Sequence, residues 1–190
     1  MMKNQERAVL RILKSPEKEY NANQLCVYLG MSSMGTLKIL RRMEDERILK
    51  SRKVSNIVFF NLSDSEYAEE YTSVLLKKEV EGSSFGRWVR EVRKIKGAEV
   101  GIVFGSILDK GQKAGDIDVL FVVKKENFKS VKKEVVKINR LSEKLIHAVY
   151  QTEEDLVNNI LKKDKVILNA VKGVVVFGER KFVKLLRNKR

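Results

Sequence analysis

Residues 99–124 read EVGIVFGSILDKGQKAGDIDVLFVVK, and this stretch decides the fold of the second half of the chain. Two apolar runs, Val100 to Phe104 and Val119 to Val123, are rich in Val, Ile and Phe, which predicts two neighbouring buried strands. The first strand ends at Gly105-Ser106, and Asp116-Ile117-Asp118 opens the second. Because residues two apart in a strand point to the same face, the two aspartates are expected to present their carboxylates together.

This pairing of a Gly-Ser turn with two acids indicates a site for a metal–nucleoside triphosphate. Two adjacent carboxylates repel each other, and such a pair is favoured where a cation lies between them. A glycine followed by a hydroxyl residue offers backbone N–H groups and an oxygen to a phosphate. We therefore predict that Gly105 and Ser106 bind the nucleotide and that Asp116 and Asp118 bind Mg²⁺ and are catalytic. The alternative is a β-hairpin with a polar loop and exposed acids.

The order Gly-Ser, spacer, Asp-x-Asp resembles the nucleotidyltransferases related to DNA polymerase β, particularly the minimal nucleotidyltransferase group. The resemblance spans residues 97–184. It implies that Gly105 and Ser106 hold the β- and γ-phosphates while Asp116 and Asp118 bridge Mg²⁺, as a hydroxyl attacks the α-phosphorus and pyrophosphate departs. The product would be a nucleotidylated protein, nucleic-acid end or small molecule.

The third acid of this family pattern is missing. Active members usually carry another carboxylate on the strand that follows the next helix, but the segment LSEKLIHAVYQT, residues 141–152, has no aspartate. His147 lies near the expected position, where it is either a metal ligand, a base or a packing residue. Glu143 would need a register shift to reach the site. The sequence therefore predicts nucleotide binding and leaves turnover open.

Composition restricts the partners and the compartment. The chain has 190 residues, with 39 Lys and Arg against 25 Asp and Glu, which gives a net charge of +14 and suits a polyanionic partner. No run is long enough to cross a bilayer and no apolar signal-peptide core is present, so we expect no membrane partner. Cys26 is the single cysteine, which excludes an internal disulfide framework, suits the reducing cytoplasm and predicts a small core residue.

The N-terminal third has the periodicity of a helix-turn-helix followed by a wing. Apolar spacing predicts a helix over residues 2–14, ended by Ser15-Pro16, and a second over 23–29, ended by Gly30. Ser32 or Ser33 can cap a third helix that runs to Glu46. Residues 50–61 then predict a two-stranded hairpin that turns near Ser55-Asn56.

The stretch LGMSSMGTLKILRRMEDERILKSRKVSNIVFFNL, residues 29–62, resembles the winged helix-turn-helix domains of prokaryotic transcription regulators. Leu37, Leu40 and Met43 are expected in the core. The resemblance implies that the third helix enters the major groove of double-stranded DNA while the wing grips phosphate. The residues expected to contact DNA are Ser33, Thr36, Lys38, Arg41 and Arg42 on the helix and Arg52 and Lys53 on the wing. Alternatively, the two helix arginines only solubilise the helix, or the domain mediates protein contacts.

These patterns predict an α/β (α+β) chain of two domains. We expect a winged helix-turn-helix domain over 1–62, a helical connector over 63–96 and a nucleotidyltransferase-like domain with a mixed sheet and helices over 97–190. In the connector, Ser63 is expected to cap a helix that ends near Val80. Its stripe from Tyr67 to Leu75 would form either a homodimer surface or the contact between the domains.

The resulting hypothesis is a DNA-binding, regulator-like protein whose second domain binds Mg²⁺–nucleotide. Nucleotide bound without turnover would change how the winged helix meets DNA. The alternatives are an active nucleotidyltransferase and, from the family resemblance, an antitoxin that modifies a toxin partner.

Overall fold

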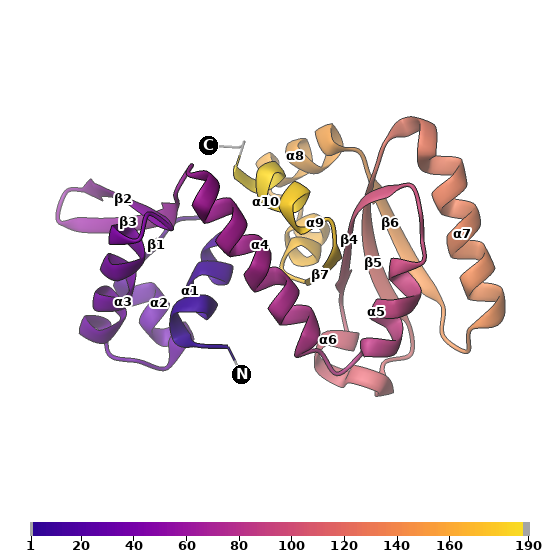
Figure 1. Cartoon of the computed structure of the whole chain (residues 1–190), viewed down its shortest axis with the longest axis horizontal. Coiled ribbons are helices and arrows are strands. Elements are labelled where there is room, and N and C mark those ends of the chain that lie inside the picture. Colours follow the sequence, from indigo (N-terminus) through magenta and orange to yellow (C-terminus); the bar gives the residue numbers. More distant parts are fainter. Residues whose placement is uncertain (1, 188–190) are drawn as a thin grey trace.

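The computed structural model describes residues 2–187, with the side chain of residue 112 excepted, and forms an elongated molecule of two unequal parts (Figure 1). The smaller, N-terminal part combines helices with an antiparallel sheet of strand order β1-β3-β2. Its helices are α1 (Asn4–Leu13), α2 (Ala22–Leu29) and α3 (Ser33–Asp45), and its strands are β1 (Tyr20–Asn21), β2 (Leu49–Val54) and β3 (Ile57–Leu62). The predicted hairpin is confirmed, because Val54 pairs with Ile57 across the turn.

Local sequence sets the helix ends of this part. The Asn21 side chain accepts from the Gln24 backbone N–H and Gln24 in turn accepts from the Asn21 N–H, which caps α2. Gly30 ends α2 with a left-handed φ of 67°, a conformation that favours glycine. Ser32 accepts from the Gly35 N–H and starts α3, as one of the two predicted caps.

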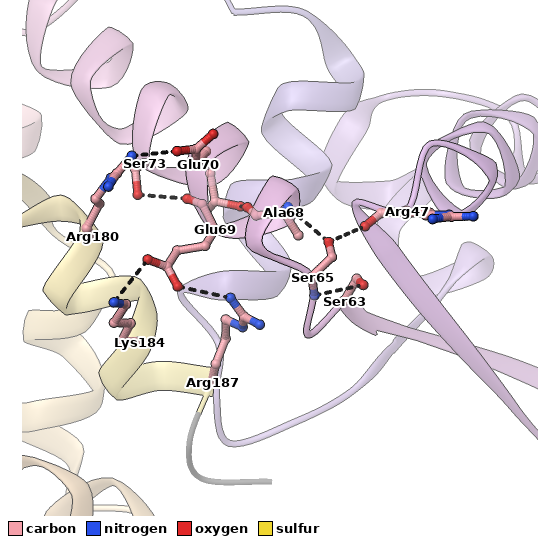
Figure 2. A network of polar contacts seen from close by, with 11 residues as sticks. Arg47, Ser63, Ser65, Ala68, Glu69, Glu70, Ser73, Arg180, Lys184 and Arg187 are labelled. Carbon is pink, nitrogen blue, oxygen red and sulfur yellow. Dashed lines mark hydrogen bonds and ion pairs between the residues drawn. The ribbon is translucent and has the colours of Figure 1, made fainter.

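The predicted connector contains helices α4 (Glu66–Glu81) and α5 (Gly86–Arg93). Ser65, rather than the predicted Ser63, caps α4 by accepting from the Ala68 N–H at 3.1 Å. Its hydroxyl also donates to the Arg47 carbonyl oxygen at 2.9 Å, which fixes the start of α4 against the end of the helix-turn-helix (Figure 2).

The C-terminal part is built on a mixed sheet of order β6-β5-β4-β7. Strand β4 (Ala98–Phe104) runs antiparallel to β5 (Ile117–Val123) and to β7 (Val174–Phe177), whereas β5 runs parallel to β6 (Ile146–Gln151). Parallel neighbours need a crossover, and α7 (Phe128–Leu141) supplies it. The other helices are α6 (Ile107–Lys110), η1 (Gly111–Lys113), η2 (Lys125–Asn127), α8 (Glu153–Leu161), α9 (Lys165–Val171) and α10 (Glu179–Arg187).

The two faces of this sheet have separate cores. Alternate strand residues such as Val119 and Phe121 pack under α5 and α7, together with Trp88 and Val131. The residues between them, such as Leu120, belong to the core shared with α8, α9 and α10. The mixed α/β fold that the apolar runs predict is thereby confirmed.

Helix α4 joins the two parts of the molecule (Figure 1). Its buried Leu75 and Leu76 belong to one continuous core that includes both N-terminal residues and residues of the C-terminal sheet. Tyr67 and Val74 of the predicted stripe remain 55% and 61% exposed. The stripe is therefore divided: its buried side connects the two parts, and a homodimer through its exposed side stays a prediction.

Charged side chains reinforce the contact of α4 with the last helix, α10 (Figure 2). Glu69 accepts ion pairs from Lys184 at 3.5 Å and Arg187 at 3.4 Å, and Glu70 pairs with Arg180 at 2.6 Å. Because Glu69 and Arg187 are each only 14% exposed, water screens this pair less than the others. Among the described residues, no helix is both long and apolar enough to cross a membrane.

Candidate functional site

The pairing of β4 with β5 places the Gly-Ser turn against the acid pair. Phe104, the last residue of β4, is the register partner of Asp118, and Gly105 follows with a φ of 77°. A Cβ atom on Gly105 would lie 2.1 Å from Oδ2 of Asp118 and 3.0 Å from its Cγ. Only glycine fits here, both because of the left-handed backbone and because the carboxylate occupies the space. Ser106 comes next and begins the short helix α6.

The two aspartates remain partly open to solvent on the same face of β5. The side chains of Asp116 and Asp118 are 43% and 31% exposed. Burial and, secondarily, the negative charge of Asp116 raise the pKa of the Asp118 carboxyl, while His147 opposes the shift. A like-charged pair of this kind is electrostatically unfavourable until a cation joins it.

His147 lies beside the acids because β5 and β6 are parallel and pair Asp118 with His147. Its Nδ1 is 3.2 Å from Oδ2 of Asp116 and 4.0 Å from Oδ1 of Asp118, and its side chain is 57% exposed. The packing alternative is thus wrong for this residue, because the ring faces the acids and solvent. Glu143 belongs to the loop before β6, where it lines a cavity with Lys144, so no third carboxylate joins the pair from this segment.

The donor atoms fit a hard divalent cation. Carboxylate and hydroxyl oxygens are the ligands that Mg²⁺ prefers, and it commonly binds through one or two carboxylates plus substrate phosphates. Because the glycine of the turn has no Cβ, its backbone can lie close to the Asp118 carboxylate. Within the described part of the chain, no group of three or more His, Cys, Asp or Glu side chains is arranged to hold a metal ion. Phosphate oxygens would therefore have to complete the coordination.

The outer face of α3 carries most of the residues predicted to contact DNA. Ser33, Lys38, Arg41 and Arg42 are exposed. Thr36 is fully buried, so its predicted place on the outer face is wrong. The reason is helical spacing: residues four apart share a face, and Thr36 precedes the buried Leu40 by four positions.

The arginines of this face are held by neighbouring carboxylates. Arg41 pairs with Glu44 at 2.6 Å, and Arg42 pairs with Glu46 at 2.8 Å. Glu44 also accepts from Ser51 at 2.5 Å, which ties the helix to the first strand of the wing.

On the wing, one of the two predicted cations is likewise held by a carboxylate. Arg52 donates Nε to Glu19 at 2.9 Å, and Glu19 also accepts from the Asn61 side chain. Within the described residues, Lys53 has no ion-pair partner, and neither does Lys38 on α3. Sequence reasoning missed Glu19, because a carboxylate 33 residues before its partner gives no local signal.

No protein-family model matches this chain, and no curated protein matches it significantly in sequence. A single-substitution mutant of Lactococcus lactis ZitR shares 17% identity at a TM-score of 0.32, over 42% of this chain and 51% of that one. Another ZitR mutant shares 12% at a TM-score of 0.36, over 73% of each chain. The adhesin competence repressor AdcR from Streptococcus pyogenes shares 16% at 0.37, over 50% of this chain and 67% of that one.

The chain thus spans about half the length of the first of these structures. TM-scores this low mark only partial agreement between folds, so function has to be inferred from the chain's own residues.

Proposed function

We propose that this chain is a DNA-binding protein whose C-terminal part binds a Mg²⁺–nucleoside triphosphate. The observation that carries the nucleotide site is the packing of Gly105 on Asp118, where even a single Cβ atom would meet the carboxylate. It keeps the Gly105-Ser106 turn next to the two carboxylates, so that one ligand could contact both.

In this proposal the turn and the acids have separate tasks. The backbone near Gly105 and the Ser106 hydroxyl would donate to phosphate oxygens. Asp116 and Asp118 would hold Mg²⁺, which when bound offsets the negative charge of the phosphates. His147 stands where the family resemblance implies a third acid, and for that reason binding without turnover is favoured over transfer.

The DNA-binding part of the proposal depends on the exposed cations of α3 and the wing. Surface ion pairs such as Arg42–Glu46 are worth little in water, and the arginine here is 69% exposed. A DNA phosphate can therefore displace Glu46 at small cost. Lys38 and Lys53 need no such exchange.

Calorimetry with Mg²⁺ and each of the four common nucleoside triphosphates tests the nucleotide site. We expect a binding heat with at least one of them, lost in Asp118→Asn. Asp109→Asn is the matched control, because Asp109 is an exposed acid in the same segment outside the pair. The site assignment is wrong if no nucleotide gives heat, or if both variants behave alike.

Selection of binding duplexes from a random pool tests the DNA-binding part. For a selected duplex, Arg42→Gln should weaken binding by roughly tenfold, as expected for a lost phosphate or base contact. Glu46→Gln removes the competing carboxylate and should not weaken it. If the pool yields no preferred sequence, sequence-specific regulation is wrong.

A further inference from the structure

Helices α5 and α7 form one outer layer on the same face of the C-terminal sheet. At one end, Asn127 just before α7 donates to the carbonyl of Gly97, which lies just after α5. At the other end, Arg87 of α5 lines a cavity of about 280 Å³ together with Lys144, just after α7. The helices therefore run antiparallel and meet at both ends. We call the exposed residues of 86–96 and 128–144 the α5–α7 face.

The two segments of the α5–α7 face hold much of the positive charge of the molecule, and α7 carries the cations that lie away from α4 (Figure 1). Arg90 and Arg93 of α5 instead line a cavity with residues of α4 and α10. The two segments contain eleven Lys and Arg residues against three Glu residues, a net +8 of the chain's +14. By contrast, residues 63–82, which include α4, hold six acidic and two basic residues. The charge of this protein is thus unevenly distributed, and an uneven charge attracts a partner of opposite sign.

Most cations of α7 are not neutralised within the molecule. Lys137 pairs with Glu134 at 3.1 Å. Within the described residues, no hydrogen bond or ion pair engages the exposed Lys129, Lys132 and Lys133, nor Arg140. The arginines of α3, in contrast, are held by carboxylates. A polyanion could contact α7 without first displacing an internal partner.

The face does not suit a membrane surface. A helix that lies on a bilayer inserts its apolar side between the lipids. Val131 and Val135 are 0% and 5% exposed and pack into the core under α7. Phe128, Val136 and Leu141 stay exposed, but their spacing does not place them on one stripe of the helix. The exposed surface of α7 therefore carries lysines and no continuous apolar side.

We propose that the α5–α7 face binds the phosphate backbone of a nucleic acid, as a second surface separate from the winged helix. A helix of 14 residues is about 21 Å long, and one strand of a duplex places a phosphate every 3.4 Å or so along its axis, so α7 can follow several phosphates. Contacts made by lysine to phosphate carry no base information, so this binding is independent of sequence.

The position of the face separates it from the winged helix. Figure 1 places α3 with the β2–β3 wing at one end of the long axis and α7 at the other. One molecule would thus hold two nucleic-acid segments, or two distant parts of one. The face also ends near the candidate nucleotide site, because Leu145, next to Lys144, accepts from the Ile117 backbone N–H between the two aspartates.

The test compares two triple variants of equal charge. The variant K129Q/K132Q/K133Q removes three cations from α7. The control K162Q/K163Q/K165Q removes three exposed lysines at the end of α8 and the start of α9, two helices that cover the opposite face of the sheet. Fluorescence anisotropy measures binding of a short random-sequence DNA duplex and of a single-stranded RNA of equal length, over a range of KCl concentrations.

For at least one probe, the α7 variant should bind roughly 10- to 100-fold more weakly at low salt, and the slope of log affinity against log salt should fall by about 2.7 for DNA, three contacts at about 0.9 each. The control should match the wild type. Equal loss in both variants would mean a general charge effect and overturn the proposal, as would wild-type protein that binds neither probe at low salt.

A winged-helix variant distinguishes this proposal from the proposed function. If Arg42→Gln weakens the selected duplex while the α7 variant binds random probes as the wild type does, the α5–α7 proposal is wrong and the winged-helix assignment stands. If instead the α7 variant binds the random probes more weakly and Arg42→Gln binds the selected duplex as the wild type does, the α5–α7 proposal is supported. The assignment of α3 as the DNA-contacting helix is then wrong.

Discussion

Replacing Gly105 by alanine tests the geometry of the candidate nucleotide site most directly. The new Cβ would lie 2.1 Å from Oδ2, 3.0 Å from Cγ and 3.2 Å from Cβ of Asp118. The φ of 77° adds about 1–2 kcal/mol for a left-handed residue with a Cβ. Pushing the Asp118 side chain away from its rotamer adds about 0.5–1.5 kcal/mol.

We therefore expect Gly105→Ala to lower the free energy of unfolding by about 1.5–3.5 kcal/mol and Tm by roughly 3–14 °C, as read by circular dichroism. The more specific consequence concerns binding, because the displaced carboxylate can no longer face the turn. Nucleotide heat in calorimetry should be lost although the chain still folds.

Gly178→Ala is the matched control for this experiment. Gly178 also has a left-handed φ, 80°, and a Cβ there would lie 2.1 Å from the carbonyl oxygen of Glu99. Backbone cannot rotate away as a side chain can, so the loss of stability should be at least as large. Glu99 lies at the opposite end of β4 from Gly105, so nucleotide binding should survive.

A double-mutant cycle with Asp118→Ala isolates the clash itself. In that background the carboxyl group is gone, and the backbone cost remains together with the 3.2 Å contact to Cβ of residue 118, so Gly105→Ala should destabilise by about 1–2 kcal/mol. If the cost is the same with and without Asp118, the contact does not decide the residue at position 105. Unchanged Tm and unchanged nucleotide binding in the single variant would refute the reasoning altogether.

Three further substitutions probe buried or charged positions. Thr36→Val should raise the free energy of unfolding by about 1 kcal/mol without weakening DNA binding, because the buried Thr36 hydroxyl has no hydrogen-bond partner; Tm and duplex affinity measure the two effects. Lys14→Met should lower the free energy of unfolding by about 2–4 kcal/mol, because the buried amine donates to Glu79 at 2.5 Å and to the Gly173 carbonyl at 2.6 Å. Without metal at neutral pH, Asp118→Asn should raise Tm, because burial and Asp116 raise the folded-state pKa of Asp118 and so disfavour its charged form. That gain in Tm should shrink as the pH falls from the raised pKa of Asp118 towards its ordinary value of 3.8. Over this range the folded wild type takes up a proton before the unfolded chain does.

Each of these has a control and a contrary outcome. A lower Tm for Thr36→Val would show that its hydroxyl is satisfied. Lys78→Met removes a more exposed amine, which pairs with Glu6, and should cost less than Lys14→Met; equal costs would contradict the role of amine burial. A Tm gain in Asp118→Asn that is independent of pH would show that the charge of Asp118 is not its cause, and Asp109→Asn controls for net charge.

Local sequence patterns were enough to predict the two strands and the residues of the candidate nucleotide site. Both apolar runs predict two neighbouring buried strands, and period 2 places Asp116 and Asp118 on one face. The antiparallel pairing of these strands comes from the structure. The family resemblance implies a position for His147 near the acids, because the third acid is expected there. Its distance to Asp116 depends on the register between the two strands, which no local signal specifies.

The failure at Thr36 has a different cause. Its polar type suggested the outer face, but its spacing from Leu40 and Met43, four and seven positions on, already predicts the buried stripe. Periodicity should have outweighed residue type. The two-residue strand β1 was missed because it is too short for any period to show.

What the sequence could not reveal is how closely the DNA-binding part and the nucleotide site are joined. The 6%-exposed Lys14 follows α1 and donates to the carbonyl of Gly173, and a Cβ on Gly173 would lie 2.8 Å from Phe104, the residue just before the Gly105 turn. The partners are separated by 159 residues. Separating the two parts would expose this buried amine and the continuous core around α4, so the predicted boundaries at 62 and 96 cross one packed core. If nucleotide affects DNA binding, it therefore acts through a packed contact that must either stay closed in both states or break at a cost of several kcal/mol. Lys14→Met distinguishes these: lower stability with an unchanged effect of nucleotide on DNA affinity would mean that the contact only supports the fold.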